Sequence, residues 1–169
     1  EVQVLADGAV QATVPVVSGA FEATVSLGEA TWELTARALD AAGNASADSA
    51  TVALTIDRTA PAAPGWSAPP PSAATLVAIS GTAEEGARVE ILDGTTVLAA
   101  GTATGGTFSL QITLAEGSHA ITVRATDAAG NAVDAGPADV VVDLTAPAAP
   151  SIVAPADGAV LGAGELAGG

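Results

Sequence analysis

The sequence predicts an all-β protein in which antiparallel β-sandwiches are repeated in tandem and joined by proline-rich linkers. Three observations support this fold class. The chain repeats itself at a spacing close to 87 residues, and its apolar residues alternate with polar residues at a period of two. Glycine, aspartate, asparagine or proline marks the junctions between the alternating segments, and no segment has a convincing helical pattern.

The internal repeat is the first of these observations. A shift of 87 positions aligns residues 1–45 with residues 88–132 without a gap, and 17 of the 45 pairs are identical. After one deletion the shift becomes 86, and most of residues 57–64 return as residues 143–150. The repeat therefore has the size of one small domain.

The repeat divides the chain into three parts. Residues 1–60, here called the first unit, are predicted to be a partial domain that lacks its first strands. Residues 61–146, the second unit, are predicted to be a complete domain. Residues 147–169 are predicted to be the first strands of a further domain, or a strand donated to a neighbouring copy.

The alternating segments predict the individual strands. Apolar and polar residues alternate over residues 108–114 and 121–125 in the second unit, and over 21–27 and 34–38 in the first. Each segment is expected to be a strand with one buried face. Shorter strands are predicted at residues 76–80, 89–92, 96–100 and 139–142. About seven short strands in one repeat favour a sandwich, and the prolines of residues 61–71 favour a semi-rigid linker with an edge strand.

Composition excludes several classes of function. Four basic and 19 acidic residues give a formal charge of −15, which disfavours nucleic acid as a partner. The chain has no cysteine and no lysine, so disulfides, thiolate metal sites and Schiff-base chemistry are excluded. No apolar run is long enough to cross a bilayer. With His119 as the single histidine, a multi-histidine zinc site is excluded too.

Four motifs in a fixed order carry a resemblance to a known family. They occupy residues 81–89, 106–110, 125–131 and 143–147. In this order they resemble the bacterial immunoglobulin-like (Big-type) repeats of large surface adhesins and secreted filament proteins. The resemblance implies tandem immunoglobulin-like domains that act as spacers outside the cell, often stiffened by calcium. The chain departs from the pattern at Glu85, where many such repeats have proline, and at Arg58, which interrupts the acidic linker.

Two loops of sequence Asp-Ala-Ala-Gly-Asn, residues 40–44 and 127–131, are the strongest candidate site. The simplest interpretation is a tight hairpin loop, because glycine supplies a positive φ and Asp and Asn bond to their own backbone. An immunoglobulin-like strand order instead brings the second loop to the pole where the linker from the first unit arrives. The candidate residues gathered at that pole are Asp57, Glu84, Glu85, Asp127 and Asn131.

Carboxylates gathered in this way repel one another, so a cation is expected among them. Calcium fits best because it accepts many oxygen ligands, and magnesium is the lesser candidate. Arg58 could neutralise the cluster without a metal, and a solvated acidic pole is a further alternative. By the same reasoning Asp40 and Asn44 would serve the preceding joint, and Asp143 the following one.

Glu29 and Glu116 occupy equivalent turns at the opposite pole of each unit. From these turns they could reach Asp57 and Asp143, respectively. An ordinary turn role is equally compatible with the sequence.

Two aromatic positions and the histidine complete the candidates. His119 aligns with Trp32 of the first unit, which favours a space-filling role at the edge of the core and argues against a Ser-His-Asp triad. Trp66 opens the second unit, and packing is favoured over stacking on a sugar because no other aromatic residue lies nearby in the sequence. No catalytic residue is predicted.

These observations predict a non-enzymatic spacer repeat of an extracellular bacterial adhesin or surface fibre, with calcium between domains as the candidate stiffening ion. Its partners are expected to be neighbouring copies or repeats of the same protein. The alternative is a self-polymerising filament subunit, in which residues 147–169 complete residues 1–60 of the next copy by strand addition. A carbohydrate-binding accessory module ranks third because aromatic residues are so few.

Overall fold

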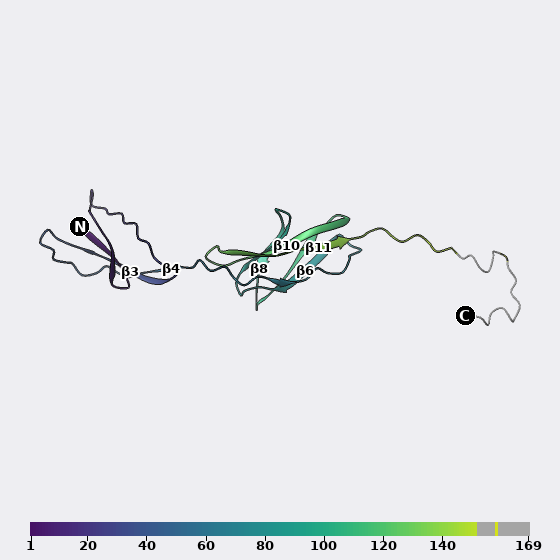
Figure 1. Ribbon diagram of the computed structural model, residues 1–169, viewed down its shortest axis with the longest axis horizontal. Coiled ribbons are helices and arrows are strands. Elements are labelled where there is room, and N and C mark those ends of the chain that lie inside the picture. The colour runs from purple at the N-terminus through teal and green to yellow at the C-terminus, as the bar shows by residue number, and fades with distance from the viewer. Residues whose placement is uncertain (152–157, 159–169) are drawn as a thin grey trace.

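The computed structural model describes residues 1–151 and 158, which form strands and turns but no helix (Figure 1). None of the described residues belongs to a helix with the length and hydropathy needed to span a bilayer. The strands are β1 (Val2–Ala6), β2 (Ala9–Val14), β3 (Ala30–Ala38), β4 (Val52–Ile56), β5 (Gly65–Trp66), β6 (Leu76–Thr82), β7 (Arg88–Asp93), β8 (Thr96–Thr102), β9 (Thr107–Thr113), β10 (Gly117–Thr126) and β11 (Ala132–Val142).

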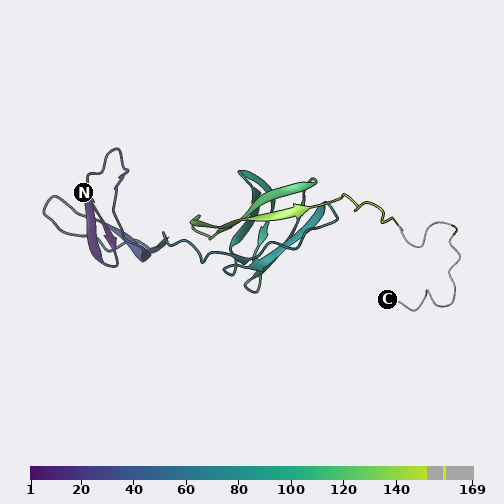
Figure 2. The same ribbon diagram turned by 45° about the vertical axis from the view of Figure 1, so that its right-hand side comes forward.

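The second unit is a two-layered antiparallel sandwich (Figures 1 and 2). One sheet has the strand order β5-β6-β9 and the other has the order β11-β10-β7-β8. Both sheets contribute aliphatic side chains to one buried cluster. Its fully buried members from five strands include Ile79, Ile91, Ile112, Ile121 and Val140. The sandwich class predicted from the alternating pattern is therefore confirmed.

Alternation explains why these segments are strands. In β10 the side chains of Ile121, Val123 and Ala125 are fully buried, and the residues between them are only half-buried. A period of two places every second side chain on the face that meets the opposite sheet. The shorter predicted strands lie within β6, β7, β8 and β11.

The first unit contains one four-stranded sheet, with the order β2-β1-β3-β4. This order repeats β8-β7-β10-β11 of the second unit, strand for strand. The register shift between Val4 and Leu5 in the β1–β2 pair recurs between Ile91 and Leu92 in the β7–β8 pair. A shift of 87 residues thus relates the two sheets even in their irregularities.

The predicted strand at residues 21–27, with Phe21, Ala23, Val25 and Leu27, is wrong: these residues form no strand. The equivalent β9 is held by β6 over its whole length, from Thr107 paired with Thr82 to Thr113 paired with Leu76. No strand in the described part of the first unit occupies the position of β6. An alternating segment without a hydrogen-bonding neighbour does not form a sheet strand.

The segment from residue 147 onward is only partly described. Residues 147–151 form no strand. Residues 152–157 and 159–169 lie outside the described residues. They make up most of residues 147–169, which are predicted to be the first strands of a further domain or a strand donated to a neighbouring copy. The proposed division of the chain at residues 60 and 146 stays a prediction.

Candidate joint between the two units

The loop at residues 127–131 is closed by hydrogen bonds between its first and last residues. The Asp127 N–H donates to the Asn131 carbonyl (3.0 Å), and the Asn131 N–H donates to Asp127 Oδ1 (2.8 Å). The side-chain amide of Asn131 donates to Asp127 Oδ2 (2.8 Å), and Gly130 has a φ of 95°. Because both carboxylate oxygens accept hydrogen bonds, the side-chain bond from Asn131 above all lowers the pKa of Asp127 from its usual value.

The loop at residues 40–44 has the same geometry. The Asn44 N–H and side-chain amide each donate to the carboxylate of Asp40 over 2.8 Å, and Gly43 has a φ of 89°. The bond from the Asn44 side chain is again the main reason that the pKa of Asp40 is lowered. The hairpin interpretation of both loops therefore accounts for the recurring Asp, Gly and Asn.

The second loop also reaches the linker. The Asn131 side-chain amide donates to the Asp57 carbonyl over 3.2 Å, in addition to its bond with Asp127. A hollow of about 270 Å³ lies at the same place, lined by Thr55, Asp57, Ala128 and Ala129. The side-chain amide of Asn131 thus links the Asp127 carboxylate to the backbone carbonyl of Asp57, while the Asp57 carboxylate itself accepts from the Thr59 N–H.

The linker is also attached to the first unit. The Thr59 hydroxyl donates to Glu29 Oε1 (2.5 Å), and the Thr59 N–H donates to Asp57 Oδ1 (2.9 Å). Arg58 donates to the Leu27 carbonyl (3.3 Å), within the first unit. Arg58 therefore binds a backbone carbonyl of its own unit, whereas the sequence predicted carboxylates of the joint as its partners.

The end of the second unit repeats this attachment. The Thr145 hydroxyl donates to Glu116 Oε1 (2.6 Å), and the Thr145 N–H donates to Asp143 Oδ1 (3.0 Å). The sequence suggested Asp57 and Asp143 as the residues that Glu29 and Glu116 reach. Each glutamate instead accepts a hydrogen bond from the threonine two residues further along the chain. The reason is local: each aspartate turns its carboxylate back to the N–H of its own turn.

The two glutamates of the turn between β6 and β7 have other partners. Glu85 accepts a hydrogen bond from the Gly106 N–H (2.8 Å), and Glu84 is exposed, with its backbone carbonyl bonded to the Ala87 N–H. Among residues 1–151 and 158, no group of three or more histidine, aspartate or glutamate side chains is arranged to hold a metal ion. Calcium binding at the joint stays a prediction from the sequence.

His119 and Trp32 hold equivalent turns. The Trp32 indole donates to the Gly28 carbonyl (3.0 Å), and His119 Nε2 lies 3.1 Å from the carbonyl of Ala115, the residue equivalent to Gly28. His119 Nδ1 lies 2.8 Å from Asp93 Oδ2. The hydrogen bond to Asp93, followed by the one to Ala115, raises the pKa of His119. The histidine thus replaces an aromatic residue at the core's edge.

Trp66 packs against the core of the second unit, and its indole donates to the Ala135 carbonyl (3.0 Å). This contact fixes β5 to the opposite sheet. The side chain is half-buried in its own domain, in agreement with the packing role favoured by the sequence.

The strand order and the two-sheet core define the second unit as an immunoglobulin-like β-sandwich. Residues 60–143 match the family described as Bacterial Ig domain, and this part of the chain belongs to that family. Domains of this family are typically non-catalytic and extracellular or surface-associated.

The solved structures that resemble the chain include two multidomain proteins. The fibronectin(III)-like modules of Clostridium thermocellum CbhA align with a TM-score of 0.55 and 18% identity, over 83% of this chain and 76% of that chain. A chimeric titin Z1Z2-Z1Z2 tandem aligns with a TM-score of 0.34 and 16% identity, over 85% of this chain and 84% of that one. The first likeness supports the all-β sandwich fold. No curated protein matches the sequence.

Proposed function

We propose that the chain is a non-enzymatic spacer from an extracellular bacterial adhesin or surface fibre, with each linker fastened to the domains on both sides of it. The observation that supports this proposal is the pair of contacts at residues 57–59. The Thr59 hydroxyl is bonded to Glu29 before the linker, and the Asp57 carbonyl is bonded to Asn131 after it. A linker that is bonded on both sides resists bending, which is what a spacer requires.

The rest of the chain is compatible with this role. Prolines at positions 61 and 64 fix their own backbone φ angles and so stiffen the connection into β5. The formal charge of −15 keeps an exposed array soluble and opposes lateral association. The partners of a spacer are its neighbouring repeats, which meet it at loops such as residues 40–44 and at linkers such as residues 143–150.

The proposal is tested by the rotational diffusion of the two units in the 169-residue chain. We expect ¹⁵N relaxation to give the same overall correlation time for amides of the first and second units, because a fastened joint makes them tumble together. Two separate and shorter correlation times, each matching a unit of its own size, would contradict a spacer function for this joint.

Calcium at the joint is the finer part of the proposal. Its oxygen ligands would come from Asp57, Asp127 and Asn131, whose amide nitrogen now bridges the oxygens of the other two. A ligand at ten times its dissociation constant stabilises the folded state by about 1.4 kcal/mol. We therefore expect millimolar calcium to raise the thermal midpoint by several degrees relative to chelator. A shift below about 1 °C would remove calcium and leave the direct amide bridge as the fastening.

A further inference from the structure

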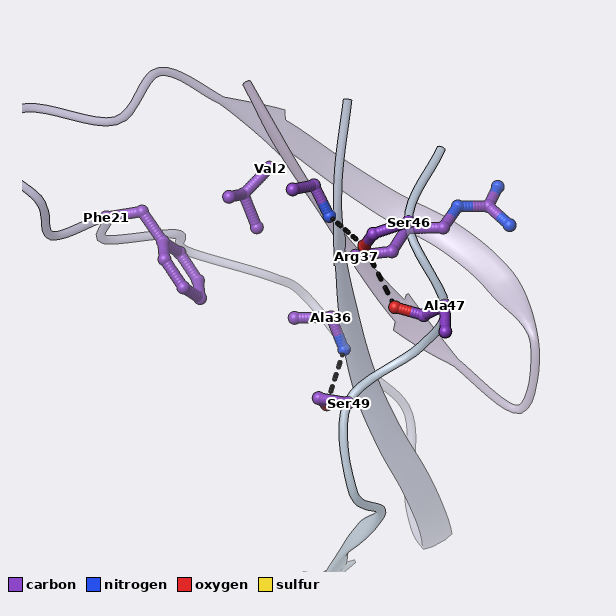
Figure 3. Close-up of a pocket in the computed structure, with 8 residues that line it drawn as sticks. Val2, Phe21, Ala36, Arg37, Ser46, Ala47 and Ser49 are labelled. Atoms are coloured by element: carbon purple, nitrogen blue, oxygen red, sulfur yellow. Dashed lines mark hydrogen bonds between the residues drawn. The ribbon is translucent and has the colours of Figure 1, made fainter. Parts of the chain in front are cut away.

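A hollow of about 290 Å³ lies on one face of the sheet of the first unit (Figure 3). The hydroxyls of Ser46 and Ser49 in its lining each accept a hydrogen bond from a backbone N–H of β3 (3.0 Å). Arg37 is its only charged lining residue and donates to Gln3 (2.8 Å), and Figure 3 shows its side chain directed away from Phe21. The polar side chains of the hollow are therefore already bonded, and nothing in it points to a ligand.

The turn between β9 and β10 of the second unit contains a titratable contact and holds the segment that follows β11. Glu116 in this turn accepts a hydrogen bond from the Thr145 hydroxyl (2.6 Å). The residue before it, Ala115, has its carbonyl 3.1 Å from Nε2 of His119. One contact thus joins the turn to the segment after β11, and the other joins the same turn to β10.

His119 can donate both of its hydrogen bonds only when each ring nitrogen carries a proton. Its Nδ1 lies 2.8 Å from the carboxylate of Asp93 and its Nε2 faces the Ala115 carbonyl, so both neighbours are acceptors. A neutral imidazole has one N–H and one lone pair. The bond to the carboxylate is the stronger of the two and keeps the remaining proton, so the lone pair of Nε2 then faces the carbonyl oxygen. The contact between His119 and Ala115 is therefore attractive in the protonated state and repulsive in the neutral state.

The charged side chains near His119 are acidic among the described residues. They are Asp93 at the end of β7, Asp139 on β11, Asp143 directly after β11 and Glu116 in the turn. The hydrogen bond to Asp93, followed by the bond to Ala115, raises the pKa of His119, while burial opposes this shift. His119 is the only histidine and the chain has no cysteine, so no other side chain is of a type that ordinarily titrates between pH 5 and pH 9.

The first unit has the same turn without a titratable contact. Trp32 stands in place of the histidine and donates its indole N–H to the Gly28 carbonyl (3.0 Å). Ala6 stands where the second unit has Asp93, in the same register on the neighbouring strand. The threonine–glutamate bond that holds the following segment is present in both units. An indole N–H keeps its proton throughout this pH range, so the turn of the first unit keeps its contact.

We propose that protonation of His119 controls how firmly residues 143–147, the segment that leaves the second unit, are fastened to that unit. In the protonated state the imidazolium holds the Ala115 carbonyl and so keeps Glu116 within reach of the Thr145 hydroxyl. Loss of the proton releases the turn, Glu116 moves with it, and the bond to Thr145 is lost. The proposal is independent of the spacer function, because it depends only on contacts of the second unit and the segment directly after it.

The test follows His119 and Thr145 by NMR in the 169-residue chain between pH 5 and pH 9. The ring chemical shifts of His119 report its protonation, and relaxation of the Cα–H bonds, which do not exchange with water, reports backbone order. We expect the order parameter of Thr145 to fall from about 0.85 to below about 0.6, with the same midpoint as the His119 titration. The order parameter of Thr59 should stay constant, because Trp32 holds the equivalent turn of the first unit.

Two variants separate the contribution of each contact. His119→Trp combined with Asp93→Ala gives the second unit the residues of the first, and Thr145 should then stay ordered at both ends of the pH range. Glu116→Ala changes an exposed residue and removes the acceptor of the threonine hydroxyl. In this variant Thr145 should have a low order parameter at every pH, while His119 should still titrate.

Four results would overturn the proposal. They are an order parameter of Thr145 that stays constant while His119 titrates, a fall that persists in the double variant, a Thr145 that stays ordered at pH 5 in Glu116→Ala, and a His119 that keeps its proton at pH 9. None of these results bears on the spacer function, which the tumbling of the two units tests.

Discussion

Each of the two units contains a four-stranded sheet with the same strand order, and the units differ in what lies against that sheet. Ile121 and Val123 of the second unit are completely buried, whereas the equivalent Leu34 and Ala36 of the first unit are half-buried. Strand order and the position of the bulge are nevertheless the same in both. Pairing within a sheet therefore sets its topology, while burial of its apolar face depends on a second layer that comes from another part of the sequence.

The largest expected effect comes from truncating equivalent core positions. Ile121→Ala should destabilise the second unit by about 3 kcal/mol and lower its thermal midpoint by more than about 10 °C, because the side chain is completely buried. Leu34→Ala should cost the first unit less than half as much, since part of that side chain already contacts water. Hydrogen exchange resolved by unit measures both changes. Equal losses would show that the first unit is as well packed as the second.

A smaller effect is a dependence of stability on pH, which we expect at the turn with His119 and not at the equivalent turn with Trp32. The pKa of His119 is raised in the folded state, so its stabilising effect is fully present below the unfolded pKa of about 6.5 and is lost as pH rises through the folded pKa. We expect the second unit to lose at most about 1 kcal/mol in this interval, as the pair is partly exposed.

The matched control for this pH effect is His119→Trp, which installs the residue that the first unit carries at the same turn. The thermal midpoint of the parent chain, measured between pH 5 and pH 9, should fall as His119 loses its proton. The thermal midpoint of the variant should not show this fall. An unchanged pH dependence in the variant would assign the titration to another group.

The smallest effects are expected at the two threonines of the linkers. Thr59→Val and Thr145→Val each remove one exposed hydrogen bond to a glutamate while keeping the side-chain shape. Each should cost less than about 1 kcal/mol in chemical denaturation. Thr59→Val should also loosen the joint to the second unit, which Thr145→Val leaves unchanged. Identical effects of the two variants on the motion between the units would argue against a role for Thr59 in the joint.

Much of the fold could be predicted from local sequence. The main error of that prediction, the strand at residues 21–27, has a non-local cause. Alternation over residues 108–114 and 21–27 is the same, yet only the former contains a strand, because β9 depends on hydrogen bonds from β6, which ends 25 residues before it. The alternating pattern indicates which face a strand would bury. It does not indicate whether a neighbouring strand is present to pair with it. That Val77 and Ile79 lie opposite β9 can be seen only in the structure of the complete sandwich.

The candidate joint was predictable in outline and not in its atoms. Asp, Gly and Asn at fixed positions indicated the turn of residues 127–131, and the strand order indicated its approach to Asp57. The threonine–glutamate bonds were missed, although Thr59 and Thr145 recur with Glu29 and Glu116 at separations of 30 and 29 residues. That recurrence is a usable signal, but side-chain direction in the linker is set by the Asp57 turn, which only the structure shows.

The most direct test of the fastened joint compares Asn131→Ala with Asn44→Ala in the 169-residue chain. Both variants lose the same bond within a loop, and only Asn131 also contacts the linker carbonyl of Asp57. Residual dipolar couplings of the two units measure the order of one relative to the other. We expect Asn131→Ala to lower this order and Asn44→Ala to leave it at the parent value; equal behaviour of the two variants would contradict the two-sided fastening on which the spacer proposal depends.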